Sequence, residues 1–105
     1  MIILFFGTTL RNESLRDEYE QANERQREIA EETPGFVSWK QWGTSEGEDI
    51  GMLSFESDEG VVAWRDHPDH VAAQKRGQEA LYGTYWVRVC ELIREADFVS
   101  DRAPT

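Results

Sequence analysis

The chain has 105 residues, with 21 acidic and 11 basic side chains and a formal net charge of −10. One domain of this size can bury a real core, whereas the excess of carboxylates disfavours nucleic acid and anionic membrane surfaces as partners, since both attract clustered Lys and Arg. The single cysteine, Cys90, allows neither an intrachain disulfide nor a cysteine metal cluster.

Residues 1–10 are rich in Ile, Phe, Leu and Thr and predict a strand with two apolar faces. The apolar start lacks a basic flank and is too short for a signal peptide or a membrane span, so we expect a cytoplasmic protein. Asn12 or Ser14 can cap a helix that follows with apolar residues at helical spacing. This helix is expected to end by Thr33, before Pro34 and Gly35.

The second half of the chain predicts three strands and two helices. Residues 36–42 and 50–56 indicate a hairpin around an acidic turn at 43–49, and residues 57–64 indicate a short helix. Pro68 interrupts it and suits the first position of a further helix over 68–81. Residues 84–93 predict the last strand. The order βαββαβ predicts an α+β, ferredoxin-like fold with an antiparallel sheet, in one domain over residues 1–95, with a tail at 96–105.

Two helical layers can cover one face of a four-stranded sheet, yet the first and last strands are apolar on both faces. A second copy packed on the open face would cover it, so we expect a homodimer with two-fold symmetry.

Both histidines lie close to a tryptophan, in the sequence WRDHPDHVAAQ at residues 64–74. Together with the aromatic segment at 82–89, this cluster predicts an apolar pocket with a few polar groups, the usual form of a small-molecule site.

These segments, in this order, resemble the antibiotic biosynthesis monooxygenase domain. The resemblance covers residues 1–95 and rests on PGFVS at 34–38, SDE at 57–59, WR at 64–65, HPDHVAAQ at 67–74 and YWVRV at 85–89. It implies a dimeric α+β barrel. Known activities of the family are cofactor-free oxygenation of aromatic polyketide-like compounds and oxidative haem degradation, and other members have no established activity.

The haem-degrading branch uses an Asn on the first strand, a Trp in the short helix and a His ligand ten residues after that Trp. Trp64 matches the second element, but the ligand position falls on Gln74, and the first falls near Phe6 or Gly7. Haem remains an alternative only if His70, one turn before Gln74, serves as the axial ligand.

His70 is the candidate catalytic residue, since an imidazole in the first turn of a helix is kept neutral and can act as a general base. The alternative is an ordinary surface histidine. Trp64 would wall the pocket or simply fill the core. His67 would contact the substrate or only cap the helix. A metal site built from the two histidines with Asp66 or Asp69 is disfavoured because Pro68 separates them, so no metal is expected.

Three further residues are candidates for substrate binding. Gln74 could offer its amide to a carbonyl or to dioxygen, although such a residue is usually solvated. Trp86 could stack on a planar ligand or belong to the core or a dimer interface. Arg88 could anchor an anionic group or pair with a carboxylate across a dimer.

The sequence therefore favours a small cofactor-independent monooxygenase acting on a planar aromatic or quinol-like small molecule, with no cofactor and His70 as base. A non-catalytic dimeric barrel that binds a small metabolite is one alternative, and a haem-binding or haem-degrading monooxygenase is the other.

Overall fold

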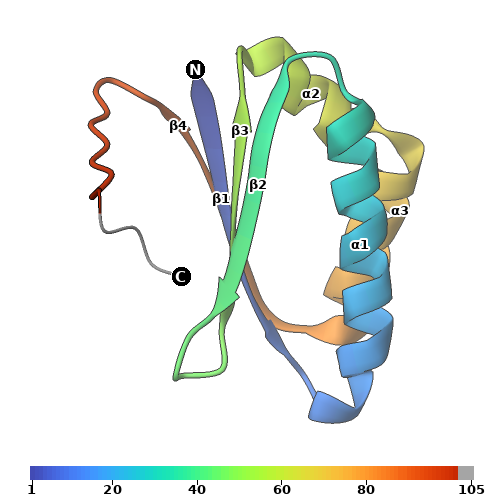
Figure 1. Ribbon diagram of the computed structural model, residues 1–105. Helices are drawn as coiled ribbons and strands as arrows, with labels where there is room; N and C mark the ends of the chain where they lie inside the picture. Colours follow the sequence, from blue (N-terminus) through green and yellow to red (C-terminus); the bar gives the residue numbers. More distant parts are fainter. Residues whose placement is uncertain (102–105) are drawn as a thin grey trace.

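The computed structural model of the chain describes residues 1–101 and is built on one four-stranded sheet (Figure 1). The strands are β1 (Ile2–Leu10), β2 (Phe36–Gly43), β3 (Asp49–Phe55) and β4 (Tyr82–Glu91), in the spatial order β2-β3-β1-β4. Every neighbouring pair is antiparallel. The α+β, ferredoxin-like fold class predicted from the sequence is confirmed.

The helices all lie on one face of the sheet, and the segment after β4 runs on the other side (Figure 1). They are α1 (Arg16–Glu32), preceded by the 3-10 turn η1 (Glu13–Leu15), then α2 (Asp58–Asp66), α3 (Pro68–Arg76) and the π-helix η2 (Gly77–Leu81). Asn12 caps η1, because its side chain accepts a hydrogen bond from the Ser14 amide. Gly35, at a φ of +86°, ends the turn after α1 with a backbone conformation that suits glycine.

The last helix and the last strand differ from the sequence prediction. The helix expected over 68–81 ends as an α-helix at Arg76 and continues as the π-helix η2, and the last strand begins at Tyr82 and ends at Glu91. Arg11 explains the early start of β4, since its side chain donates to the carbonyls of Gln78 and Tyr82. These bonds tie the end of β1 to the turn from η2 into the strand.

The core lies between the sheet and the helices. Leu4, Leu53 and Phe55 from the strands pack against Ile29 of α1 and Val61 of α2, and all five are buried. At ~25 cal/mol per Å² of apolar surface, each such side chain stabilises the fold by about 1.5–3 kcal/mol relative to full exposure. This core fixes the distance between the helices and the sheet.

The opposite face of the sheet carries no helix (Figure 1). Directly paired residues of an antiparallel sheet share a face, so Ile3, Phe5, Met52 and Cys90 point away from the core. Their side chains are half-buried or exposed. Residues 92–101 follow β4 on this side without regular structure and leave Ile93, Phe98 and Val99 exposed. Residues 102–105 of the expected tail lie outside the described residues.

Candidate functional site

A pocket lies between the helices and the covered face of the sheet. Its enclosed space measures about 30 Å³ and reaches about 370 Å³ only when the open mouth is counted, so the enclosed part is well below the usual size of a small-molecule site. Phe6, Thr8, Trp39 and Tyr85 come from the sheet. The helices and the start of β4 contribute the other lining residues, which are Tyr19, Asn23, Gln26, Trp64, His70, Gln74 and Tyr82. Among the described residues, none that lines the pocket is charged. The pocket is therefore aromatic and electrically neutral.

His70 lies in the wall of this pocket, on the first turn of α3, and is only 5% exposed. Its Nδ1 lies 3.0 Å from the carbonyl oxygen of Arg65. Because a carbonyl can only accept, Nδ1 donates the hydrogen, and in the neutral ring Nε2 keeps its lone pair. Nε2 is buried and has no hydrogen-bond partner. Burial also lowers the pKa of His70, so the ring is a neutral base near pH 7.

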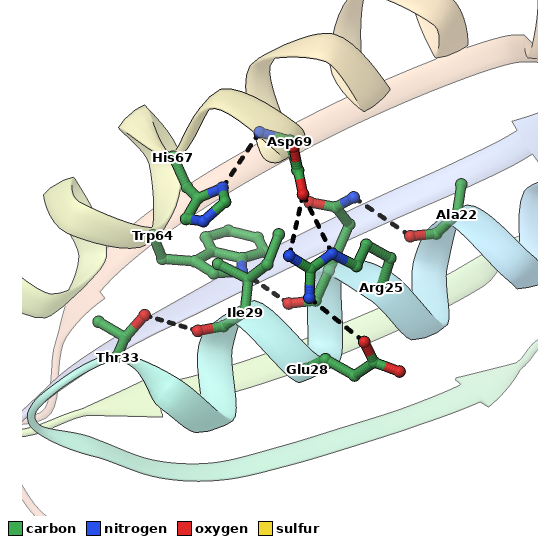
Figure 2. Close-up of polar contacts among 9 residues, drawn as sticks. Ala22, Arg25, Glu28, Ile29, Thr33, Trp64, His67 and Asp69 are labelled. Carbon is green, nitrogen blue, oxygen red and sulfur yellow. Dashed lines mark hydrogen bonds and ion pairs between the residues drawn. The ribbon is translucent and has the colours of Figure 1, made fainter.

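Trp64 holds His70 in place. The two ring centroids are 4.1 Å apart, and the indole is 4% exposed. Its Nε1 donates a 2.9 Å hydrogen bond to the main-chain carbonyl of Gln26 on α1, drawn as a dashed line in Figure 2. Trp64 also meets Trp39 of β2 edge to face at 6.3 Å. One side chain of α2 thus joins α1, α3 and the sheet at the pocket.

Three tyrosines line the pocket beyond His70. Tyr82 and Tyr85 stack with centroids 5.1 Å apart, and Tyr19 of α1 meets Tyr82 edge-on at 6.4 Å. Burial raises the pKa of all three hydroxyls, that of Tyr19 to about 12, while a hydrogen bond from the Gln74 side chain opposes the rise at Tyr85. These hydroxyls are protonated at neutral pH, so they donate hydrogen bonds and do not act as bases.

The π-helix η2 places Tyr82 in the pocket. A Cβ atom on Gly77 would lie 2.1 Å from the Tyr82 ring, so only glycine leaves room for the ring beside the helix. Single π-helical turns often occur at functional sites. The wide turn here ends the helix early and delivers two tyrosines of β4 to the pocket.

Helix α1 contributes a polar stripe that the sequence analysis did not assign to the site. Tyr19, Asn23 and Gln26 are spaced by four and three residues and face the pocket together. In the sequence, Gln26 follows Tyr19 and Ala22 at the spacing of one helix face. A glutamine at a core position was the available signal, because such an amide needs a partner.

Ion pairs fasten α1 to α3 on the outer side of the pocket. Arg25 donates to Asp69 Oδ2 with Nη2 at 2.9 Å and Nε at 3.2 Å, and its Nη1 reaches Glu28 (Figure 2). At the other end of α3, Arg76 pairs with Glu18 of α1 at 2.8 Å. Exposed pairs of this kind add little to stability because solvent screens them, so their main effect is to set the spacing of the two helices.

The structure brings together three of the six predicted site residues, Trp64, His70 and Gln74, in this pocket. His67 is the N-cap of α3, where its Nδ1 accepts a 3.0 Å bond from the Asp69 amide (Figure 2). Trp86 packs over Gly7 on the open face of the sheet and donates to Glu48 at 2.8 Å.

Arg88 also lies on the open face of the sheet. Its guanidinium is 5.6 Å from the centroid of the Trp86 ring and donates to the Val87 carbonyl. In the structure, His67, Trp86 and Arg88 therefore lie outside the pocket that holds His70.

Haem does not fit this pocket. Its two propionates would meet a lining that has no Lys or Arg, and unpaired charges are costly to bury. The macrocycle would also have to share the space with three tyrosines. For a metal ion, residues 1–101 contain no group of three or more His, Cys, Asp or Glu side chains positioned to bind one.

A known bacterial protein is similar to this chain in sequence. Over 80 residues the chain is 30% identical to the uncharacterized protein YqjZ of Bacillus subtilis (strain 168), an alignment that spans 76% of this chain and 70% of YqjZ. The chain belongs to the same family as YqjZ. No protein-family model matches it.

Solved structures show the same fold at low sequence identity. Rv0793 from Mycobacterium tuberculosis superimposes with a TM-score of 0.77 at 14% identity, over 92% of this chain and 100% of that one. SnoaB, a cofactor-independent oxygenase from Streptomyces nogalater, gives 0.75 at 11%, over 90% and 94%. An antibiotic biosynthesis monooxygenase gives 0.75 at 7%, over 90% and 100%. This chain, a relative of YqjZ, thus has the antibiotic biosynthesis monooxygenase fold, as the sequence resemblance predicted. No helix within residues 1–101 is both long and apolar enough to cross a membrane.

Proposed function

We propose that this protein is a small cofactor-independent monooxygenase acting on a planar aromatic or quinol-like molecule, with His70 as the general base. The observation that carries the proposal is the unpaired, buried Nε2 of His70 in an aromatic pocket. A neutral imidazole with one nitrogen fixed by a carbonyl and the other free is arranged to accept a proton.

The proposed chemistry needs only substrate and dioxygen. His70 Nε2 accepts a proton from an activated CH₂ group or its enol, and the resulting carbanion passes one electron to dioxygen. The two radicals combine into a peroxide anion, which takes the proton back from His70 and becomes a hydroperoxide. Loss of water then leaves a carbonyl, so one oxygen atom enters the product and the other leaves as water.

The pocket supports this chemistry in two ways. Its aromatic walls, Phe6, Trp39 and Tyr85, match a flat ring system. The imidazolium formed in the first step would keep the Nδ1 hydrogen bond to the Arg65 carbonyl. SnoaB, a cofactor-independent oxygenase that shares the fold, supports the same reaction class.

Oxygen uptake with anthrone- and quinol-like compounds tests the proposal, together with mass analysis of the product after reaction under ¹⁸O₂. We expect one labelled atom per product and a loss of about 10²–10⁴-fold in rate in His70→Ala, the usual contribution of a general base. Val71→Ala, an exposed change on the same helix, is the matched control. Equal rates in wild type and His70→Ala would remove His70 from the mechanism.

A non-catalytic metabolite-binding barrel is the second candidate, and the small size of the pocket favours it. In that case the protein would bind ring compounds with no oxygen uptake above the rate in buffer. Binding in parallel with the uptake assay separates the two functions.

We also propose that two chains form a homodimer through the open face of the sheet. The apolar side chains there, among them Ile3, Phe5 and Met52, are not covered by any helix. Light scattering after size exclusion should give about twice the chain mass of 12.2 kDa, and a stable monomer at micromolar concentration would refute the dimer. The cytoplasmic location is likewise a proposal, checked by cell fractionation.

A further inference from the structure

The pocket holds two buried acceptor atoms without partners. One is Nε2 of His70 on α3, and the other is Oε1 of Gln26 on α1. Both residues are more than nine-tenths buried, with exposures of 5% and 7%. Buried polar atoms without a partner are destabilising and rare in folded proteins. Two in one pocket indicate a ligand that satisfies both.

The orientation of the Gln26 amide follows from its neighbour. Its Nε2 lies 3.2 Å from the main-chain carbonyl of Ala22, one turn earlier on α1 (Figure 2). Since that carbonyl can only accept, the NH₂ group must face it, and Oε1 is left free as an acceptor. The main-chain carbonyl of Gln26 is fixed separately by the indole of Trp64. Gln26 is thus held by two bonds while its acceptor stays unused.

Thr8, Asn23 and Gln74 also line the pocket, but within residues 1–101 they have no buried side-chain atom that lacks a partner. Tyr19 has a buried hydroxyl without such a partner, but its pKa is raised by burial, so it keeps its proton and can donate. No Lys, Arg, Asp or Glu lines the cavity, and the whole chain carries a net charge of −10. A charged ligand would lose its hydration without gaining a partner, and an anion would also be repelled.

We propose that Gln26 is a specificity-determining residue, and that the pocket selects a neutral planar compound with two hydrogen-bond donors, one for His70 Nε2 and one for Gln26 Oε1. This inference rests on the proposed function only in placing the ligand in this pocket. Water can fill the two positions in the free protein. A ligand that displaces this water must bring its own donors, or both acceptors are left unpaired.

Binding without oxygen tests the inference apart from catalysis. Isothermal titration under nitrogen compares 1-naphthol, which has one donor, with the dihydroxynaphthalene isomers and with a hydroxynaphthoic acid. At least one dihydroxy isomer should bind wild type about 10-fold or more tightly than 1-naphthol, since a hydrogen bond to a buried unpaired group has about that effect. The carboxylated compound should bind more weakly than 1-naphthol.

Two variants remove the acceptor and keep a side chain of similar size, Gln26→Leu and Gln26→Met. In both, affinity for the preferred dihydroxy isomer should fall about 10-fold, and affinity for 1-naphthol should change less than about 2-fold. Gln21→Met, an exposed glutamine on the same helix, is the matched control and should keep the wild-type ratio. The expression and thermal melting of each variant show that it is folded.

Three results would overturn the inference. These are equal affinity of wild type for 1-naphthol and for every dihydroxy isomer, an unchanged affinity ratio in both Gln26 variants, and no binding of any probe at millimolar concentration. The monooxygenase proposal fails separately, when the probes bind with the expected ratio but no compound consumes oxygen in air.

Discussion

The neutral state of His70 makes stability depend on pH in a defined window. Histidine in an unfolded chain protonates near pH 6.5, whereas burial keeps the folded ring neutral to a lower pH. Between those two pKa values the unfolded chain binds the extra proton, so the free energy of unfolding falls as pH falls. The stabilisation from this difference is complete above pH 6.5 and is lost as pH decreases below it.

The size of the effect has a ceiling set by the unfolded state. If the folded ring stays neutral down to pH 5.5, protonation of the unfolded histidine lowers the free energy of unfolding by RT ln(1 + 10), about 1.4 kcal/mol, and by less than about 0.1 kcal/mol at pH 7.5. The expected loss between the two pH values is thus up to about 1.3 kcal/mol.

Urea unfolding followed by tryptophan fluorescence at half-unit pH steps measures this loss. His70→Gln is the comparison, because glutamine does not titrate and its NH₂ group can still donate to the Arg65 carbonyl. Carboxylates remote from His70, such as Glu13, whose pKa is lowered by the hydrogen bond from Arg16, titrate alike in both proteins and cancel. The stability advantage of wild type over the variant should shrink toward low pH. Parallel profiles would show that His70 protonates as readily in the fold as out of it, and would refute the assignment of a neutral buried base.

Three substitutions test the packing around the pocket. Gly77→Ala puts a Cβ atom 2.1 Å from the Tyr82 ring, so urea unfolding should show a loss of about 1–3 kcal/mol, and a loss below ~0.5 kcal/mol would contradict the close contact. Trp64→Phe removes the indole donor to Gln26 and should cost about 1–3 kcal/mol with an unchanged denaturant slope, whereas a neutral result would argue against that bond. His67→Ala removes the cap acceptor and should cost ~1 kcal/mol, and His67→Asn should restore most of it, since asparagine is a good N-cap; equal loss in both would exclude capping.

Local patterns were sufficient for the order of the elements. The strands of the sheet are β-branched and aromatic runs bounded by turn residues, and Pro68 stops one helix and starts the next at the residue where the structure separates α2 from α3. The count of two helices against four strands also predicted that one face of the sheet is left without a helix. These features depend on neighbours in the chain, so the sequence displays them directly.

The site depended on contacts between distant residues. His70 and Trp64 are close in sequence and were predicted together, but the unpaired Oε1 of Gln26 exists only because α1 packs against Trp64, 38 positions away. The π-helix was missed since it follows from the fit of the Tyr82 ring against Gly77. Trp86 and Arg88 lie on the face of the sheet opposite the pocket, because successive side chains of a strand point to alternate faces. The pairing register of β4 with β1 decides which set faces the pocket.

The sequence by itself thus determined the βαββαβ order, the antiparallel sheet with one uncovered face and the residues from which a pocket could be built, because hydrophobic period, capping and turn chemistry are local. Only the tertiary structure decided which side chains share the pocket, which nitrogen of His70 is free and that no charge lines the cavity. Those properties arise where burial removes water from groups that are far apart in the chain, and the price of an unpaired polar atom is set there.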